Sequence, residues 1–249
     1  THQLAVGYEA DFEIFSKSRH SRQNDQNQNF FALADIRFPS FYINVLERLS
    51  ETSGRAGTTF TERIPRFDQS IHPKFGYKWR RATLETGFQH SVRDFRRQID
   101  DPFDFQLSEW TEVLFYDLFA RLKLLLEYTA AQVDYDDNFS RKGRFHQARV
   151  GLEGEVMPNL FLKVRSGPHF RRYPNGSERN FNLWVADFRL EYEMRKNLTL
   201  KAEFVREPVE ATFVETHFYR EHLYQLGLEY QFRRQWGVFS EVKYYRHFY

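Results

Sequence analysis

The sequence lacks cysteine, and it also lacks any long hydrophobic run. Without cysteine, both a disulfide framework and a thiolate metal site are excluded. Because no stretch of about 18 apolar residues occurs, a transmembrane helix is excluded as well. Even the apolar stretch 122–126 contains Lys123 and is followed directly by Glu127. If this chain enters a membrane, it does so with strands.

Charge and aromatic content are both high, at 28% and 18% of the residues. A disordered chain would be poor in aromatic residues, so disorder is excluded. A membrane barrel needs apolar residues on alternate positions only, because its lumen is wet, and this composition is typical of such a barrel. The formal net charge of +2 gives no argument for a nucleic-acid partner, and none is predicted.

Extended, alternating stretches begin at nearly regular intervals along the chain. Each interval holds one strand, a polar loop, a second strand and a short turn, which is typical of an up-and-down β-barrel. The sequence therefore predicts an all-β, antiparallel transmembrane barrel formed by residues 1–249 as a single domain. The predicted strands that leave the short turns start at Leu4, Phe41, Ala82, Ala120, Leu160, Leu198 and Trp236.

The connections alternate between short turns, such as 39–40 and 157–159, and long polar loops. Short turns on one rim with long loops on the other are characteristic of outer-membrane barrels, in which the short turns are periplasmic. We therefore predict that the chain lies in the bacterial outer membrane, with the lipid bilayer and lipopolysaccharide as partners. The predicted long loops cover residues 16–29, 51–72, 96–106, 135–143, 173–180 and 207–216.

Charged residues alternate with the apolar ones on the predicted strands, and they are expected to line the lumen. One interpretation is a ladder of cross-strand ion pairs that stiffens the wall. The other is a charged constriction that selects solutes or sugar acids. The residues predicted to line the lumen are Arg149, Glu153, Lys163, Arg165, Arg189, Glu191, Lys201 and Glu203.

Aromatic residues gather toward the ends of the predicted strands. Amphipathic rings favour the level of the lipid headgroups, which predicts a girdle at each membrane interface. The alternative is that these rings pack in the core of a soluble β protein. The residues predicted to lie at the interface are Tyr8, Trp79, Trp110, Trp184, Trp236 and Tyr249.

The sequence contains no HExxH or GxSxG motif, and we predict neither an enzyme nor a cofactor nor a metal site. Two weaker alternatives were considered. Glu153 and Glu191 could face each other as a glycosidase-like pair, although a salt ladder is the simpler interpretation. The loop carboxylates Asp134, Asp136 and Asp137 could bind calcium, but this pattern is unspecific.

The second half of the chain resembles the β-barrel porin 2 family, a group of outer-membrane proteins. The resemblance runs from about residue 75 to the end, and it is carried by the order and spacing of 126–128, 133–135, 150–152, 170–173, 206–207, 211–213 and 244–249. It implies an envelope role near exopolysaccharide synthesis and export, with polysaccharide or periplasmic export proteins as partners. It implies no catalytic residues, and related chains continue for further strands.

The leading functional hypothesis is an outer-membrane pore or envelope component, linked to exopolysaccharide export or solute passage. The alternative is a plugged or partner-docked barrel that serves as an anchor or scaffold. Thirteen strands can be identified, whereas bacterial single-chain barrels normally have an even number. We therefore expect 14 or 16 strands in the complete barrel, either through strands beyond Tyr249 or through a misassigned hairpin in the region 51–81.

Overall fold

The structure is a computed structural model of the 249-residue chain. It describes residues 2–13, 25–52, 65–96, 104–136, 142–174, 180–210, 218–233 and 236–248, and the statements below concern these residues. Among them, no helix is long and apolar enough to cross a membrane. The described residues are almost entirely β-strand.

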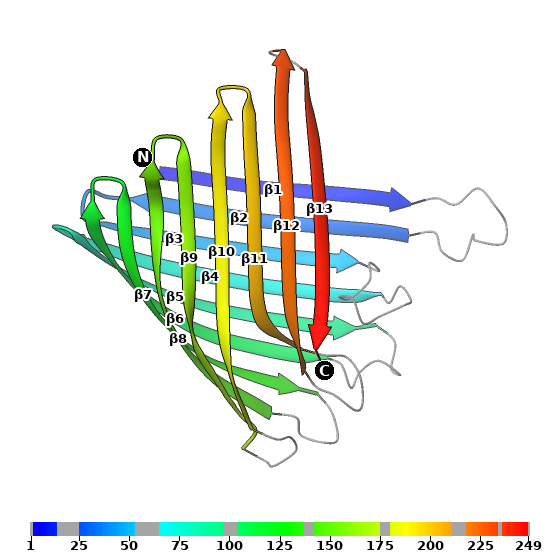
Figure 1. The fold of residues 1–249 in the computed structure, drawn as a ribbon. Coiled ribbons are helices and arrows are strands. Elements are labelled where there is room, and N and C mark those ends of the chain that lie inside the picture. The colour runs from blue at the N-terminus through cyan, green and yellow to red at the C-terminus, as the bar shows by residue number, and fades with distance from the viewer. Residues whose placement is uncertain are drawn as a thin grey trace.

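Thirteen strands form one antiparallel sheet, in which every strand pairs with its neighbours in sequence (Figure 1). The fold class predicted from the sequence is therefore confirmed. The strands are β1 (His2–Glu13), β2 (Asp25–Arg37), β3 (Phe41–Thr52), β4 (Arg66–Trp79), β5 (Ala82–Phe95), β6 (Phe105–Phe119), β7 (Leu122–Tyr135), β8 (Lys142–Met157), β9 (Leu160–Arg172), β10 (Phe181–Arg195), β11 (Leu198–Glu210), β12 (Phe218–Arg233) and β13 (Trp236–Phe248).

Most of the predicted strand starts agree with the structure, because tight turns leave little freedom in where a strand begins. Five of the seven, from Phe41 to Trp236, are correct to the residue. The start predicted at Ala120 is two residues early, because Ala120 and Arg121 form the turn and β7 begins at Leu122. Arg80 and Asn159, in two of these turns, adopt positive φ angles of 51° and 66°, as tight hairpin turns require.

Five of the six predicted loops extend into strands, and three of them do so by four residues or more at one end. Residues 25–29 belong to β2, residues 66–72 to β4 and residues 207–210 to β11. The physical reason is that strand pairing uses backbone hydrogen bonds. Polar residues can therefore continue a strand when the adjacent strands provide backbone partners. Pro73 in β4 also weakened the sequence signal, and the pairing of β4 with β5 is indeed interrupted between Ile71 and Lys74.

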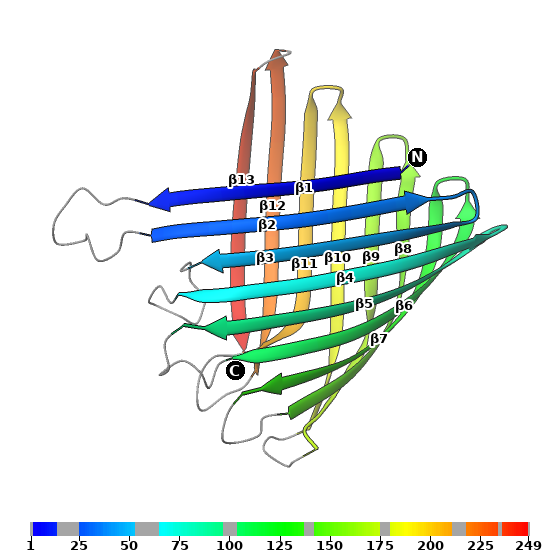
Figure 2. The ribbon, with the colours of Figure 1, turned by 180° about the vertical axis from the view of Figure 1, so that it is seen from behind.

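The sheet bends around β7–β9, so that β1–β6 cross β10–β13 steeply in both views (Figures 1 and 2). Strands β8 and β9 approach closely at two glycines. A Cβ atom at Gly151 would strike the backbone carbonyl of Val164, and one at Gly167 would strike the carbonyl of Ala148. Glycine at these positions thus permits the close strand approach at the bend.

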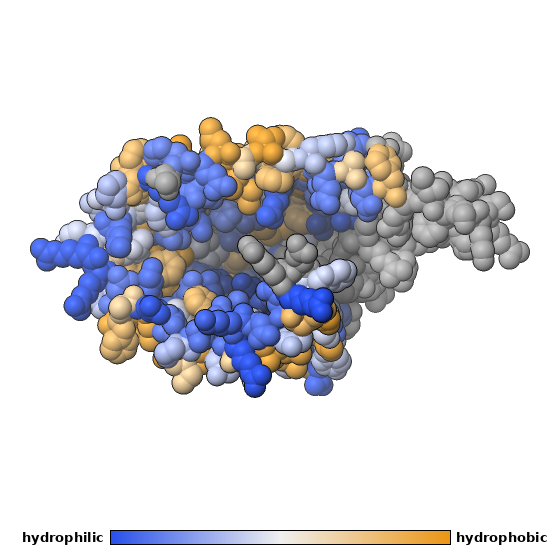
Figure 3. Space-filling view, turned by 90° about the horizontal axis from the view of Figure 1, so that it is seen from above, coloured by the Kyte–Doolittle hydropathy of each residue, from blue (hydrophilic) through white to orange (hydrophobic). Residues whose placement is uncertain are grey.

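Hydrophobic and polar side chains are distributed in the reverse of a soluble protein. Large apolar side chains point outward, such as Leu4 with an exposed fraction of 80% and Val242 with 66%, whereas Glu127 and Arg171 are buried at 6% and 2%. Seen from above, the space-filling view shows apolar groups on the outside of a hollowed body with polar groups toward its interior (Figure 3). This is the arrangement of a barrel wall with a wet interior.

Strands β1 and β13 form the two edges of the sheet, and their described residues do not pair with each other. In an up-and-down sheet all odd-numbered strands run in the same direction, so direct closure of β1 on β13 would be parallel. The described residues of the region 51–81 hold the end of β3 and the single strand β4, while residues 53–64 lie outside the described part. Strands beyond Tyr249 remain a prediction.

Candidate functional site in the concave face

A cluster of four charged residues lies on the concave face at the bend of the sheet. Glu127 occupies the face of β7 that also carries the buried Leu125 and Thr129, because side chains alternate with a period of two. The strand register places Arg149 of β8 opposite Glu127, and Arg165 of β9 opposite Asp187 of β10. The four residues thus come from four consecutive strands.

These charges are mutually satisfied. The Glu127 carboxylate accepts hydrogen bonds from Arg149 and, at 2.8 Å, from Nη1 of Arg165. The Asp187 carboxylate accepts bonds from Nη1 of Arg149 at 3.1 Å and from Nε of Arg165 at 2.9 Å. Each arginine therefore bridges both carboxylates. Because charge-assisted bonds of this kind are the strong ones, the cluster ties β7–β10 together.

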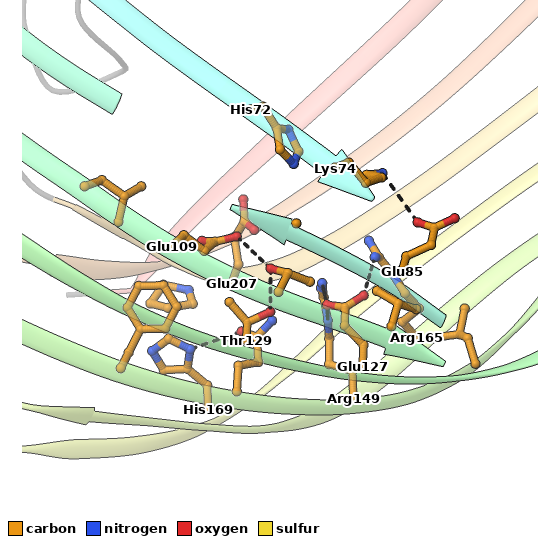
Figure 4. Close-up of a pocket in the computed structure, with 18 of the residues that line it drawn as sticks. His72, Lys74, Glu85, Glu109, Glu127, Thr129, Arg149, Arg165, His169 and Glu207 are labelled. Carbon is orange, nitrogen blue, oxygen red and sulfur yellow. Dashed lines mark hydrogen bonds and ion pairs between the residues drawn. The ribbon is translucent and has the colours of Figure 1, made fainter. Parts of the chain in front are cut away.

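The cluster forms part of the floor of a hollow of about 530 Å³ (Figure 4). Side chains from β4–β9 line this hollow, together with Glu207 and Pro208 of β11. His72 and Lys74 point into it from β4, on the other side from His169 and Arg149 (Figure 4). The hollow therefore lies between the two halves of the bent sheet.

The described residues lining the hollow carry five acidic and five basic side chains, so its formal charge is zero with the histidines neutral. Three phenylalanine rings, Phe105, Phe115 and Phe145, also line it. The charged residues are Glu85, Glu109, Glu127, Glu153 and Glu207 together with Lys74, Arg149, Lys163, Arg165 and Arg171.

The other residues predicted to line the lumen also lie on the concave face, and most of them form ion pairs. Lys163 contacts Glu153 at 2.9 Å, and Arg189 contacts Glu203 at 3.0 Å. Lys201 lies opposite Glu191 in the register, yet its ammonium contacts Glu229 at 2.6 Å. Salt bridges therefore continue along β8–β12. Among the residues predicted to line the lumen, Glu191 is the one for which the described residues show no salt bridge.

The predicted interface aromatics point to the outside. Trp79 and Trp236 lie at the ends of β4 and β13 next to the short turns, and each has an exposed fraction of 64%. Trp110 and Trp184 lie nearer the long-loop ends of their strands, and Tyr8 lies on the outward face of β1. Tyr249 lies outside the described residues. Their role at a membrane interface remains a prediction.

Sequence reasoning did not select Glu127, Glu109, Glu207 or His169, which the fold brings to the hollow. The period-two pattern of β7 would have placed Glu127 on the lumen face. No local pattern could bring Glu207 of β11 toward Glu109 of β6, because that proximity depends on the bend. Nδ1 of His169 donates a hydrogen bond to Oε1 of Gln147 at 3.1 Å, while the buried Nε2 atom of His169 has no partner among the described residues.

Neither of the weaker chemical alternatives is supported by the geometry. The row that holds Glu153 continues through Lys163 to Arg189, so basic side chains separate Glu153 from Glu191. Asp137 lies outside the described residues, and the described ones contain no group of three potential ligands that could hold a metal ion.

Comparison with known proteins identifies the fold alone. No protein-family model matches the sequence, and no curated protein matches it. The resemblance to the β-barrel porin 2 family therefore stays a prediction.

Solved structures of outer-membrane receptors do match. The siderophore receptor PirA from Pseudomonas aeruginosa aligns over 99% of this chain with 12% identity and a TM-score of 0.51. The siderophore receptor PirA from Acinetobacter baumannii aligns over 98% with 7% identity and a TM-score of 0.50. The chain spans about half the length of these receptors, 48% and 47% respectively. It has the fold of an outer-membrane barrel domain, with thirteen antiparallel up-and-down strands in one sheet.

Proposed function

We propose that the chain forms the wall of a β-barrel in the bacterial outer membrane, and that a polar, uncharged solute passes along its concave face. The observation that carries this proposal is the hollow beside Glu127, whose formal charge is zero. The lining charges therefore favour neither cations nor anions overall, and Arg149 and Arg165 already bind carboxylates. Exposed polar groups and aromatic rings are what a carbohydrate requires.

Exopolysaccharide export is the envelope context that we propose for this passage. Its support is the family resemblance together with the three phenylalanine rings in the hollow, onto which sugar rings could stack. The matching structures are siderophore receptors, which suggests siderophores as another solute class. At 12% identity or less, that likeness supports the fold and gives no argument for the solute.

Conductance in planar bilayers tests the passage. We expect discrete current steps with weak ion selectivity, and a current that a neutral oligosaccharide reduces. Alanine substitution of Lys163, Arg165 and Arg189 should change the selectivity if these residues line the path. Conductance that oligosaccharide leaves unchanged would contradict a carbohydrate solute.

A plugged or partner-docked scaffold is the second candidate, and the salt-bridge network along β7–β12 favours it because such a network stiffens a wall. A protein that inserts fully and conducts no current would support the scaffold and contradict passage. Unchanged ion selectivity in the alanine variants would assign the three basic residues to structure.

A further inference from the structure

The outward face of β11–β13 shows the layers expected of a membrane-spanning wall. Tyr230 lies toward the short turns, and Tyr224 pairs with Tyr244 toward the long loops, with ring centroids 6.1 Å apart. The six residues from Tyr230 to Tyr224 span about 20 Å along the strand. Between them lie exposed apolar side chains such as Leu226 and Val242. These rings thus bracket a band of apolar side chains on the outward face, the face that a membrane barrel turns toward lipid.

Immediately beyond the Tyr224–Tyr244 pair, the next outward position on each strand is basic. His222 lies opposite Arg206 of β11 on one side and opposite Arg246 of β13 on the other. Arg220 follows one outward position further along β12, opposite Phe248. The row therefore stands at the long-loop edge of the apolar band, where lipid headgroups lie.

Arg220, His222 and Arg246 lie against the Phe248 ring, and Arg206 lies opposite His222 on β11. We call these five residues the Phe248 cluster (Arg206, Arg220, His222, Arg246 and Phe248). The guanidinium carbons of Arg220 and Arg246 lie 4.4 and 4.7 Å from the ring centroid. The His222 ring lies 4.8 Å from it. Cation–π contacts thus hold the cations together despite their like charge.

The cluster contains no acidic residue, and within the described part of the chain its arginines make no ion pair. The Nε atoms of Arg206 and Arg220 and the Nε2 atom of His222 are buried without a hydrogen-bond partner. Five acidic residues of these three strands lie at alternate positions on the concave face, namely Glu203, Glu207, Glu221, Glu229 and Glu241. The sixth, Glu210, is the last residue of β11 and lies opposite Phe218 at the long-loop end. Three unpaired arginines on an outward face are costly unless an anion reaches them from outside.

We propose that the Phe248 cluster binds a phosphate group of a phosphorylated glycolipid in the outer leaflet of the membrane. This rests on the membrane placement given above but not on solute passage. The long-loop rim faces the exterior, where the outer leaflet of an outer membrane carries such lipids. Arginine pairs with phosphate through two parallel bonds, and the aromatic rows position the headgroup beside the cluster.

The test compares two sets of arginines on the same rim. In the triple variant R206Q/R220Q/R246Q the cluster loses its guanidinium groups. The control R144Q/R172Q alters two outward arginines of β8 and β9 that already bond to Gln132 at 3.2 Å and to Asn182 at 2.9 Å. The full chain is reconstituted in phosphatidylcholine nanodiscs that contain lipid A, and the lipid A bound per protein is measured by native mass spectrometry.

We expect the triple variant to bind lipid A about tenfold less, and the control to remain within about twofold of the parent. Lipid A whose phosphates have been removed should bind the parent as weakly as lipid A binds the triple variant. Equal binding by parent and triple variant, or equal binding of dephosphorylated lipid A, overturns the proposal. Displacement of lipid A by inorganic phosphate at millimolar concentration overturns it in favour of a free-anion site.

Insertion of each variant is checked by circular dichroism. If the triple variant does not insert, the single variant R246Q takes its place, because Arg246 is the most exposed of the three; it should bind lipid A about threefold less, and unchanged binding overturns the proposal. The lipid-binding proposal and the solute-passage proposal can be contradicted independently of each other. A chain that binds lipid A but conducts no current contradicts passage alone, and one that conducts without binding lipid A contradicts this site alone.

Discussion

Arginine has opposite surroundings on the two faces of this sheet. On the concave face, Arg149 and Arg165 share the carboxylates of Glu127 and Asp187, and few donors remain for a ligand. On the outward face of β11–β13, Arg206 and its neighbours lie among aromatic rings, and their guanidinium groups make no ion pair among the described side chains. The comparison shows that the function of a charged residue is indicated by its partners. An arginine that is paired with carboxylates stabilises the fold, whereas one without such a partner is available to bind a ligand.

The largest expected effect comes from breaking the concave cluster. Glu127→Ala leaves Arg149 and Arg165 with Asp187 as their one remaining shared partner, at a site where the Glu127 side chain is 4% exposed. Removing one member of a buried ion pair costs about 3 kcal/mol. We expect that decrease in the free energy of unfolding, measured by urea titration in lipid vesicles.

The matched control is Glu229→Ala, because the Lys201–Glu229 pair is 41% and 45% exposed. Exposed pairs contribute less than about 1 kcal/mol, so this variant should unfold almost like the parent. Similar losses in both variants would show that water screens the Glu127 cluster as fully as the exposed pair.

The space beside the backbone differs between two glycines of the concave face, Gly167 at the bend and Gly227 away from it, and Gly167→Ala tests this difference. The added Cβ atom would meet the backbone of β8 at Ala148, so strands β8 and β9 must separate. Overpacking of this kind costs about 2 kcal/mol, measured by the same urea titration. At Gly227 the nearest atom to an added Cβ is 3.6 Å away, so Gly227→Ala should be neutral or slightly stabilising. An equal loss at both positions would contradict the close approach at the bend.

The aromatic centre of the outward cluster can be removed without changing any charge. Phe248→Ala takes away the ring that lies 4.4 Å from Arg220 and 4.7 Å from Arg246. We expect lipid A binding to fall about fivefold, because the cations then lose the contacts that gather them. Phe232→Ala, an outward ring near the opposite rim, is the control and should bind as the parent does. Unchanged binding in Phe248→Ala would assign this ring to packing alone.

The smallest expected effect is the response of the two faces to salt concentration, because lipid A binding on the outward face and the stability of the concave cluster should respond differently. Raising sodium chloride from about 0.05 M to about 0.5 M shortens the Debye length and screens exposed charges. Lipid A binding at the Phe248 cluster should fall about threefold, measured by native mass spectrometry after equilibration. The free energy of unfolding should change by less than about 1 kcal/mol, because the Glu127 cluster is buried. A large change in stability with constant lipid binding would reverse the comparison.

Much of the fold could be predicted from particular residues. The strand starts at Phe41, Ala82, Leu160, Leu198 and Trp236 are correct because each follows a tight turn with its own sequence signal. The strand segment 66–72 was missed, since Gln69 interrupts the apolar row and Pro73 cannot donate to the ladder. There the pairing with β3 outweighs the local preference, and that pairing depends on residues about 20 positions away.

The candidate site was predictable in part. Arg149 and Arg165 were expected on the lumen face, and the structure places them on the concave face in one cluster. Their principal partner Glu127 was not selected, although the alternation of β7 assigns it to the same face. His169 and Glu207 could not be identified, because nothing local relates β9 to β11 across the hollow.

The sequence by itself determined which face each side chain takes, because the side-chain direction in a strand alternates with every residue and needs no distant partner. The thirteen strands of the described residues could also be identified locally, because each has its own alternating pattern between turns or polar loops. The tertiary structure decided which charges meet, because register and sheet curvature arise from pairing between strands. The bend at β7–β9 brings Glu207 to the hollow, and the register of β11–β13 places Arg206, Arg220 and Arg246 together on the outward face.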